Sequence, residues 1–405
     1  MKQKTIRVFE HGVLRCGREL NDRQFHALLA FNDAEGGDYF RAGHRKIRFR
    51  HYVGFLQVGG LAIEVLPKAD KDAGGEAPWR DALIDMLRIV GSLRLNRSTE
   101  AQLRTRDASL LELYVLHFVG LTDRILREGL AKGYRRVQRN RPVFRGRLLL
   151  DQQLRKNAAR PHFSFTEQAV FDQNTLPNST LRAALEVVRH IPLSSTTRAE
   201  VDRVLLAFPD HVQPCVDLPA LARLRLGRNT VRYAEALTLA ALILRHHRPD
   251  LAHGRTEVFS LMLDMNALWE RYVLALLRRI APEHVTVRGQ DSRPFWKAVG
   301  SSARSIRPDA VLYDGQTPRL VVDTKWKRPP NDRPASGDLQ QMFAYNELFG
   351  CPDSTLLYPG DPTRGHRGGF IEKEHGCRVA FVDLVAGGAY SRSAAETQLR
   401  QLLDL

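Results

Sequence analysis

Two neighbouring apolar segments in the last third of the chain constrain its fold most, because each contains an aspartate where a buried strand is expected. Residues 306–313 and 320–326 are predicted strands, and the turn-forming sequence Asp314-Gly315-Gln316-Thr317-Pro318 separates them. The run Leu320-Val321-Val322 comes directly before Asp323. It predicts a central strand buried on both faces. A buried carboxylate there is costly unless a cation compensates its charge.

The length of the turn predicts how the two strands pair. If those five residues form the hairpin loop, Tyr313 pairs with Arg319, and Asp309 lies directly opposite Asp323 on one face of the sheet. Lys325 follows Asp323 by two residues and therefore projects from the same face. The side chains between and beyond them, Val322, Thr324 and Trp326, are expected on the other face.

Two adjacent carboxylates and an ammonium group form a set that suits phosphodiester chemistry. Asp309 and Asp323 would repel each other unless they share a hard cation such as Mg²⁺. Lys325 can stabilise negative charge that develops on a phosphate or orient the attacking water. We therefore predict a Mg²⁺-dependent hydrolase in which Asp309, Asp323 and the carbonyl of Thr324 hold the metal. The simpler interpretation is a charged hairpin face without activity.

The segments around this pair alternate between helix and strand, which predicts a mixed α/β sheet with helices on its faces. In the helix before the strands, Glu270 flanks the apolar stripe and can face the sheet. In the helix after them, Gln341 and Tyr345 are four residues apart and share one face. The predicted helices cover residues 264–280, 337–349 and 394–403, and the other predicted strands cover residues 284–288, 355–358 and 379–384.

The first two thirds of the chain have a different organisation. Residues 53–58 and 61–66 are predicted strands joined by Gly59-Gly60, a strong hairpin signal. Apolar residues at helical spacing follow, with predicted helices that include residues 176–190 and 231–247. We expect a β-rich domain over 1–75, a mainly helical region over 76–250 and an α/β domain over 251–405.

The middle region carries much of the chain's positive charge. Residues 127–160 contain eleven lysines and arginines against two acids, a net +9 of the +16 of the whole chain. Such a stretch can bind a DNA backbone or dock an acidic protein surface, and the sequence favours neither. The residues singled out for DNA or partner binding are Arg135, Arg136, Arg139, Arg141, Arg145 and Arg147.

The overall charge and the cysteines indicate which kind of partner and which cellular location to expect. A pI near 10.0 favours a polyanionic partner, and nucleic acid is the commonest one. The longest nearly apolar run, about nine residues from Ala236, is too short to span a bilayer, so we expect no membrane partner. The four cysteines form no CxxC pair, which favours a reduced cytoplasmic location over a disulfide or zinc framework.

The acidic and lysine set resembles the PD-(D/E)xK nuclease superfamily, and the Gln341/Tyr345 pair resembles its RecB-like branch. In that branch a residue placed like Glu270 contributes to the metal site. The chain looks most like the McrC family, the nuclease subunit of modification-dependent McrBC restriction systems. The resemblance rests on Asp323-Thr324-Lys325-Trp326-Lys327, on Asp338-Leu339-x-Gln341-Met342-x-x-Tyr345, on Ile63–Lys68 and on Arg145-Gly146-Arg147-Leu148.

This resemblance implies a catalytic set, a cofactor and a partner. Asp309, Asp323, Lys325 and Glu270 would be catalytic, Gln341 and Tyr345 would support them, and Mg²⁺ would be the cofactor. The partner would be a hexameric McrB-like AAA+ GTPase that binds GTP, recognises methylated DNA and is stimulated by this chain. Two alternatives remain open: a DNA-binding regulator of an AAA+ partner that does not cut, and a standalone RecB-like exonuclease.

Overall fold

The computed structural model describes residues 4–34, 36–68, 75–91, 109–248 and 258–404. The chain divides into two compact units, one formed by residues 1–94 together with 254–405 and the other by residues 95–253. The sequence-based division differs from this one, because the predicted first and last domains belong to a single unit. The boundary expected near residue 250 falls in residues 249–257, outside the described residues.

The first unit contains a mixed sheet in which a strand from the last third of the chain pairs with strands from the N-terminal region. Its strand order is β1-β6-β5-β11, with β1 parallel to β6 and the other pairs antiparallel. The hairpin predicted around Gly59-Gly60 is confirmed, with Val58 paired to Leu61. Gly54 allows β5 to approach β11, because a Cβ atom on it would lie 2.1 Å from the carbonyl oxygen of Leu261. The strands are β1 (Lys4–Phe9), β5 (Tyr52–Val58), β6 (Leu61–Leu66) and β11 (Val258–Asp264).

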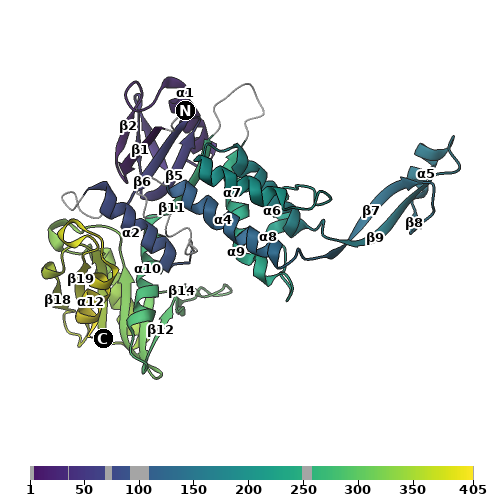
Figure 1. The fold of residues 1–405 in the computed structure, drawn as a ribbon. Helices are drawn as coiled ribbons and strands as arrows, with labels where there is room; N and C mark the ends of the chain where they lie inside the picture. Colours follow the sequence, from purple (N-terminus) through teal and green to yellow (C-terminus); the bar gives the residue numbers. More distant parts are fainter. Residues whose placement is uncertain (1–3, 35, 69–74, 92–108, 249–257, 405) are drawn as a thin grey trace. The chain divides into compact units, whose positions relative to one another are not determined.

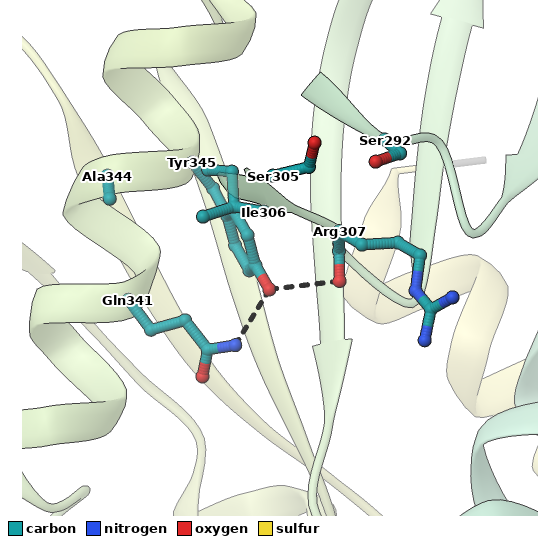
Figure 2. A pocket seen from close by; sticks show the side chains of 7 residues that line it. All are labelled: Ser292, Ser305, Ile306, Arg307, Gln341, Ala344 and Tyr345. Atoms are coloured by element: carbon teal, nitrogen blue, oxygen red, sulfur yellow. Dashed lines mark hydrogen bonds between the residues drawn. The ribbon is translucent and has the colours of Figure 1, made fainter. Parts of the chain in front are cut away.

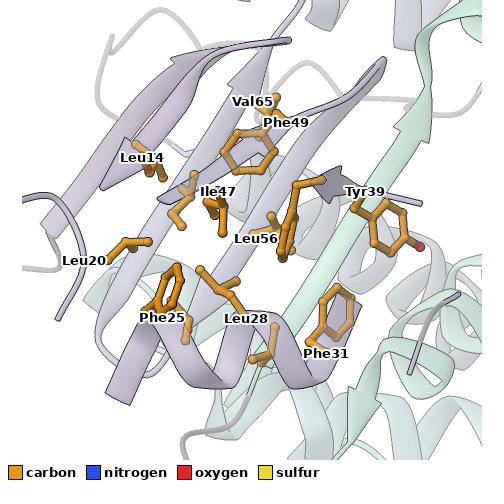
Figure 3. Close-up of a cluster of buried hydrophobic side chains, with 14 of the residues drawn as sticks. Leu14, Leu20, Phe25, Leu28, Phe31, Tyr39, Ile47, Phe49, Leu56 and Val65 are labelled. Atoms are coloured by element: carbon orange, nitrogen blue, oxygen red, sulfur yellow. The ribbon is translucent and has the colours of Figure 1, made fainter. Parts of the chain in front are cut away.

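A three-stranded sheet and helix α1 (Asp22–Ala34) pack against this first sheet. The small sheet has the order β2-β4-β3, with β2 at Val13–Arg15, β3 at Phe40–Gly43 and β4 at Lys46–Phe49. Its apolar side chains share one core with those of α1 and β5, in which Leu28 and Ile47 are completely buried (Figure 3).

The second sheet of the first unit has the order β12-β15-β16-β17-β19-β18 (Figure 1). Strands β16, β17 and β19 are parallel, and the remaining pairs are antiparallel. Helix α11 covers one face, where Met342 and Tyr345 pack on Val321. Helices α10 and α12 contact the sheet through β12, β16 and β19. The bounds are α10 (Met265–Ile280), α11 (Ser336–Phe349), α12 (Arg392–Leu403), β12 (Val285–Gly289), β15 (Ala310–Asp314), β16 (Thr317–Thr324), β17 (Asp353–Pro359), β18 (His366–Gly369) and β19 (Gly376–Val382).

The central hairpin keeps the predicted register but not the predicted turn. Leu312 pairs with Leu320 and Ala310 with Val322, the alignment that brings Asp309 level with Asp323. The expected five-residue loop is wrong, because Asp314 pairs with Thr317 across a two-residue turn. A bulge at Arg319 restores the alignment, since Tyr313 pairs with Pro318 and not with Arg319.

The motif Ile63–Lys68 contains a buried acid, Glu64, which pairs in part with helix α2 (Glu76–Ile89). Glu64 is fully buried and forms ion pairs with Arg7 and Arg80, at N–O distances of 3.0 and 3.6 Å. Lys68 lies over the ring of Phe9, 4.7 Å from its centroid. The motif therefore has a structural explanation.

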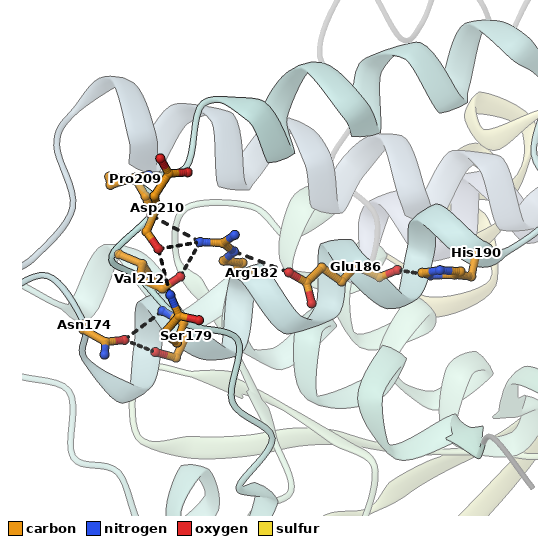
Figure 4. A network of polar contacts seen from close by, with 9 residues as sticks. Asn174, Ser179, Arg182, Glu186, His190, Pro209, Asp210 and Val212 are labelled. Carbon is orange, nitrogen blue, oxygen red and sulfur yellow. Dashed lines mark hydrogen bonds and ion pairs between the residues drawn. The ribbon is translucent and has the colours of Figure 1, made fainter. Parts of the chain in front are cut away.

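The second unit is a bundle of helices with a long β-ribbon extending from it (Figure 1). In the bundle α6 contacts α7 and α9, and α4 contacts all three. Arg182 of α6 donates hydrogen bonds to the carbonyls of Pro209 and Val212 and so anchors the segment after α7 (Figure 4). No helix in the described part of the chain is both long and apolar enough to cross a membrane. The bounds are α4 (Leu110–Arg127), α6 (Leu176–His190), α7 (Ser195–Leu206), α8 (Leu218–Ala222), α9 (Ala234–His246) and β10 (His247–Arg248).

The ribbon consists of β7 (Gly133–Arg141), β9 (Ser164–Asp172) and the short β8 (Arg147–Leu148), with helix α5 (Leu150–Asn157) at its end. Strands β7 and β9 pair antiparallel along their whole length. Gly146 has a φ of +87°, and a Cβ atom on it would lie 2.2 Å from the carbonyl oxygen of Glu167. The strongly basic segment found in the sequence therefore forms most of this ribbon.

Candidate active site

Strand β16 and the bend before β15 bring the predicted acids together beside α11. Asp323 is 2% exposed near the end of β16, where the adjacent strand β17 runs parallel to it. Asp309 is half-buried and precedes the first residue of β15, so it lies outside the ladder. Apolar strand residues position both carboxyl groups, since Ala310, Val311, Val321 and Val322 are all essentially inaccessible to solvent.

Asp309 is held by Thr324. Its Oδ2 accepts hydrogen bonds from the Thr324 amide at 2.7 Å and from the Thr324 hydroxyl at 2.8 Å. The sequence predicts Thr324 on the face opposite Asp309, yet its hydroxyl contacts that carboxylate. Asp309 lies in a bend before β15 begins, so it is outside the ladder that pairs Ala310 with Val322.

Lys325 connects the acids to helix α11. Its Nζ lies 2.7 Å from Oδ2 of Asp323 and donates a 3.1 Å hydrogen bond to Oε1 of Gln341. Gln341 in turn donates to the hydroxyl of Tyr345 at 2.7 Å. That hydroxyl donates to the carbonyl oxygen of Arg307 at 3.1 Å, two residues before Asp309 (Figure 2). The predicted supporting pair therefore forms a continuous chain of hydrogen bonds between the lysine and the bend.

Glu270 is also at this site, together with a residue that the sequence did not single out. Glu270 is half-buried on α10, and its Oε1 accepts a hydrogen bond from the side-chain amide of Gln290. The backbone amide of Gln290 donates to the carbonyl of Asp309 at 3.3 Å. Gln290 follows β12 with a φ of +58°, a conformation that non-glycine residues seldom adopt. No sequence signal would have identified it, because it follows a strand of ordinary composition.

The pKa of each of the three carboxyl groups is raised above its ordinary value. Burial is the main cause, and it raises the pKa of Asp323 to about 6, with the charge of Asp309 adding to the effect. Burial likewise raises the pKa of Asp309, although the hydrogen bonds from Thr324 oppose the change. The pKa of Glu270 is raised by burial and then by Asp309. Burial works to lower the pKa of Lys325, but the nearby carboxylates, Asp323 first, raise it above its ordinary value.

These features determine which ion the site could accept. The raised pKa values of these carboxyl groups indicate that the cations around them do not fully balance their negative charge. All of the atoms that could bind an ion at this site are oxygens. Hard divalent cations prefer such donors, so the residues present fit Mg²⁺. Asp309, Asp323 and the Thr324 carbonyl remain the predicted ligands. Among the described residues, no group of three or more His, Cys, Asp and Glu side chains is arranged as a metal site.

The six arginines singled out in the sequence lie on or beside the ribbon of the second unit. Arg136, Arg139, Arg145 and Arg147 are exposed. Arg135 has a structural role, because its guanidinium forms a bidentate ion pair with Asp172, with N–O distances of 2.9 and 2.8 Å. Exposed apolar side chains accompany these exposed arginines, with Tyr134, Val143, Phe144, Leu150, Leu154 and Phe171 each more than half exposed.

Comparison with known proteins gives the chain a family and a fold. The family model described as "McrBC 5-methylcytosine restriction system component" matches residues 47–359. A chain in the refined half-complex from the tetradecameric assembly of Thermococcus gammatolerans McrB AAA+ hexamers with bound McrC aligns with a TM-score of 0.69. The two chains are 22% identical, and the alignment covers 99% of each, a similarity that shows a shared fold.

A second solved structure, the cryo-EM structure of the Thermococcus gammatolerans McrBC complex, contains a chain that aligns with a TM-score of 0.49 at 22% identity. The alignment covers 69% of the present chain and 89% of that one. A search of curated protein sequences gave no match.

Proposed function

The chain belongs to the McrBC family of 5-methylcytosine restriction system components, and on this premise we propose that it is the DNA-cleaving subunit of such a system. The observation that carries the proposal is the convergence of Asp309, Asp323 and Lys325 at one end of β15 and β16. We take the set to be of the PD-(D/E)xK nuclease type that the sequence resembles, with Glu270 from the preceding helix as a further acid. The proposed reaction is hydrolysis of a DNA phosphodiester.

Each residue of the set has a distinct part in this reaction. Mg²⁺, when bound by Asp309, Asp323 and the Thr324 carbonyl, would polarise the scissile phosphate and lower the pKa of the attacking water. Thr324 orients Asp309 through two hydrogen bonds. Lys325 stabilises negative charge that develops on the phosphate, and Asp323 and Gln341 hold its ammonium group in place. Glu270, positioned by Gln290, contributes a further oxygen or accepts a proton from water.

We also propose that the ribbon of the second unit docks on an AAA+ GTPase partner of the McrB type. Its far part combines exposed arginines with exposed apolar side chains, among them Val143, Phe144 and Leu154. Protein interfaces use cations and exposed apolar side chains together. The ribbon also belongs to the unit that does not contain the proposed active site. We therefore favour partner docking over the DNA alternative for this segment.

The experiment that tests the proposed function is cleavage of 5-methylcytosine-containing and unmethylated plasmid DNA by the full chain. Reactions contain Mg²⁺ and are run with and without the candidate AAA+ partner and GTP. We expect double-strand cleavage of the methylated plasmid only when Mg²⁺, partner and GTP are all present. Stimulated GTP hydrolysis without any cleavage would favour the non-cleaving regulator. Cleavage that needs neither partner nor GTP would favour the standalone exonuclease.

A further inference from the structure

A second hairpin lies directly beside the proposed active site and has no role in the mechanism above. It is formed by β13 (Arg293–Trp296) and β14 (Arg304–Ile306), which pair antiparallel as a separate two-stranded sheet. In Figure 1 this hairpin extends away from the helices and strands that surround it within its unit. Its second strand leads into Arg307-Pro308-Asp309, so only two residues separate the hairpin from a predicted metal ligand.

The composition of this hairpin is unusual for an exposed element. Residues 292–308 contain four cations, Arg293, Lys297, Arg304 and Arg307, and no acid. The hairpin also exposes large apolar groups, with Phe295 53%, Trp296 56% and Val299 106% exposed. Trp296 pairs across the hairpin with Arg304, so an aromatic and a cationic residue lie next to each other. Exposing two aromatic rings to water is unfavourable unless a partner covers them.

The foot of the hairpin is anchored, which distinguishes it from a loose loop. Arg293 donates a 2.8 Å hydrogen bond to the carbonyl of Leu348, and its guanidinium lies 4.1 Å from the ring centroid of Phe349. Both contacts are to α11, the helix that also supplies Gln341. The hairpin is therefore fixed to the same helix that positions Lys325, and its direction is set relative to the catalytic set.

A pocket of about 540 Å³ lies between the foot of the hairpin and α11 (Figure 2). Ser292, Ser305 and Arg307 line it from the hairpin side, and Gln341 and Tyr345 line it from α11. Two of these residues are joined directly, because the hydroxyl of Tyr345 donates a hydrogen bond to the carbonyl of Arg307. The pocket thus lies between the exposed hairpin and the residues of α11 that contact Lys325 and Arg307.

We propose that the β13–β14 hairpin is a DNA-binding arm that holds the duplex next to the scissile phosphate. Lys297 and Arg304 contact phosphates, and Phe295 and Trp296 pack against sugars and bases in the groove. Charge complementarity favours DNA over an acidic protein here, because the all-cationic hairpin runs directly into a site built for a phosphodiester. This inference rests on the proposed nuclease function. It identifies the hairpin as the element that binds the DNA next to the bond that is cut.

The test compares two double variants of the full chain, K297A/R304A and F295A/W296A, with K46A/R48A as control. Lys46 and Arg48 are exposed cations on β4 of the same unit, distant from the hairpin in sequence. Binding of a fluorescent DNA duplex is titrated at several salt concentrations, and cleavage is followed with Mg²⁺, partner and GTP. GTPase stimulation by each variant reports that its fold and its partner binding are intact.

We expect K297A/R304A to weaken duplex binding tenfold or more at physiological salt. The slope of log K against log salt should fall by about 2, one for each lost phosphate contact. F295A/W296A should weaken binding by about fivefold to thirtyfold and leave that slope unchanged. If both variants bind DNA with the affinity and salt slope of the wild type, and the wild-type protein cleaves DNA, the proposed role of the hairpin is wrong while the proposed nuclease function stands. Loss of GTPase stimulation with unchanged DNA binding would instead identify a protein interface. Failure of the wild-type protein to bind or cleave DNA would overturn the nuclease and the arm together.

Discussion

The indole N–H of Trp326 donates a 2.7 Å hydrogen bond to Oε1 of Glu10, although 316 residues separate them in the chain. The backbone amide of Lys68 donates to the same oxygen at 2.8 Å. Trp326 directly follows Lys325, the proposed catalytic lysine, and packs against Trp79 and Trp269, with ring centroids 6.4 and 5.4 Å apart. The N-terminal strands thus support the segment that carries Asp323 and Lys325.

The same contact makes the stability of this unit depend on pH. Burial raises the pKa of Glu10 from 4.5 to about 7, and the charge of Asp264 adds to the effect. The folded state therefore holds a proton that the unfolded state has already released between these two values. As pH rises through this window, stability falls, by an amount on the order of 3 kcal/mol. Below pH 4.5 both states are protonated, and this carboxyl then contributes no penalty.

We predict that Glu10→Gln makes the protein more stable than the wild type at pH 8 and nearly equal to it at pH 5. An amide oxygen can still accept from Trp326 and Lys68, but the buried charge is absent. Urea unfolding at a series of pH values measures the difference, with the exposed Glu283→Gln as matched control. A wild-type-minus-variant difference that does not change with pH would contradict the assignment of a buried, proton-holding Glu10.

Gly54 provides a test of how closely β5 and β11 approach. Its φ is +133°, and an added Cβ atom would collide with the carbonyl oxygen of Leu261 at 2.1 Å. Gly54→Ala should therefore destabilise the protein by about 2–4 kcal/mol, seen as a lower unfolding midpoint. Gly60→Ala is the matched control, because nothing lies within 4 Å of its added Cβ atom. Equal midpoints for the two variants would show that β11 does not pair with β5 as described.

Gln341 is predicted to position Lys325 and not to act on the substrate itself. Gln341→Leu removes the acceptor for the lysine and the donor to Tyr345. We expect cleavage to fall about tenfold to a hundredfold, with duplex binding nearly unchanged. Gln341→Glu restores an acceptor for Lys325 and should recover part of the rate, with an altered pH profile. Equal losses in both variants would indicate that Gln341 contributes packing alone.

The exposed end of the ribbon should be needed for partner stimulation and not for the cleavage chemistry. V143S/F144S replaces two side chains that are 62% and 60% exposed, so the fold should tolerate the change. We expect at least a tenfold loss of affinity for the AAA+ partner, measured by titrating its GTPase activity. R225A/R228A, two exposed arginines elsewhere in the same unit, is the control. If V143S/F144S still stimulates the GTPase fully but binds DNA more weakly, the ribbon binds DNA and not the partner.

The sequence predicts best where local signals and long-range structure agree. Helix α6 was expected over residues 176–190 and occupies those residues, and the alternation of helices and strands predicted the second sheet. The register at Asp323 was right although the turn was wrong, because the bulge at Arg319 compensates for the shorter loop. The apolar pattern at 320–322 correctly indicated a strand with two covered faces.

The missed features depend on distant partners or lack an apolar pattern. Strand β11 pairs with β5 about two hundred residues earlier in the chain, and no local periodicity reports such a pairing. Strand β7 buries none of its residues fully, so it has no apolar face for the sequence to reveal. Glu10 and Gln290 acquire their roles only through contacts made in the folded chain.

The most direct test of the central claim is cleavage by Asp323→Asn. This substitution keeps the shape of the side chain but removes the charge that pairs with Lys325 and would bind Mg²⁺. The exposed Asp314→Asn, in the turn of the same hairpin, is the matched control. With partner, GTP and methylated DNA, we predict at least a hundredfold loss of cleavage for Asp323→Asn, with GTPase stimulation retained, and wild-type cleavage for the control. Wild-type cleavage by Asp323→Asn would contradict the assignment of this site.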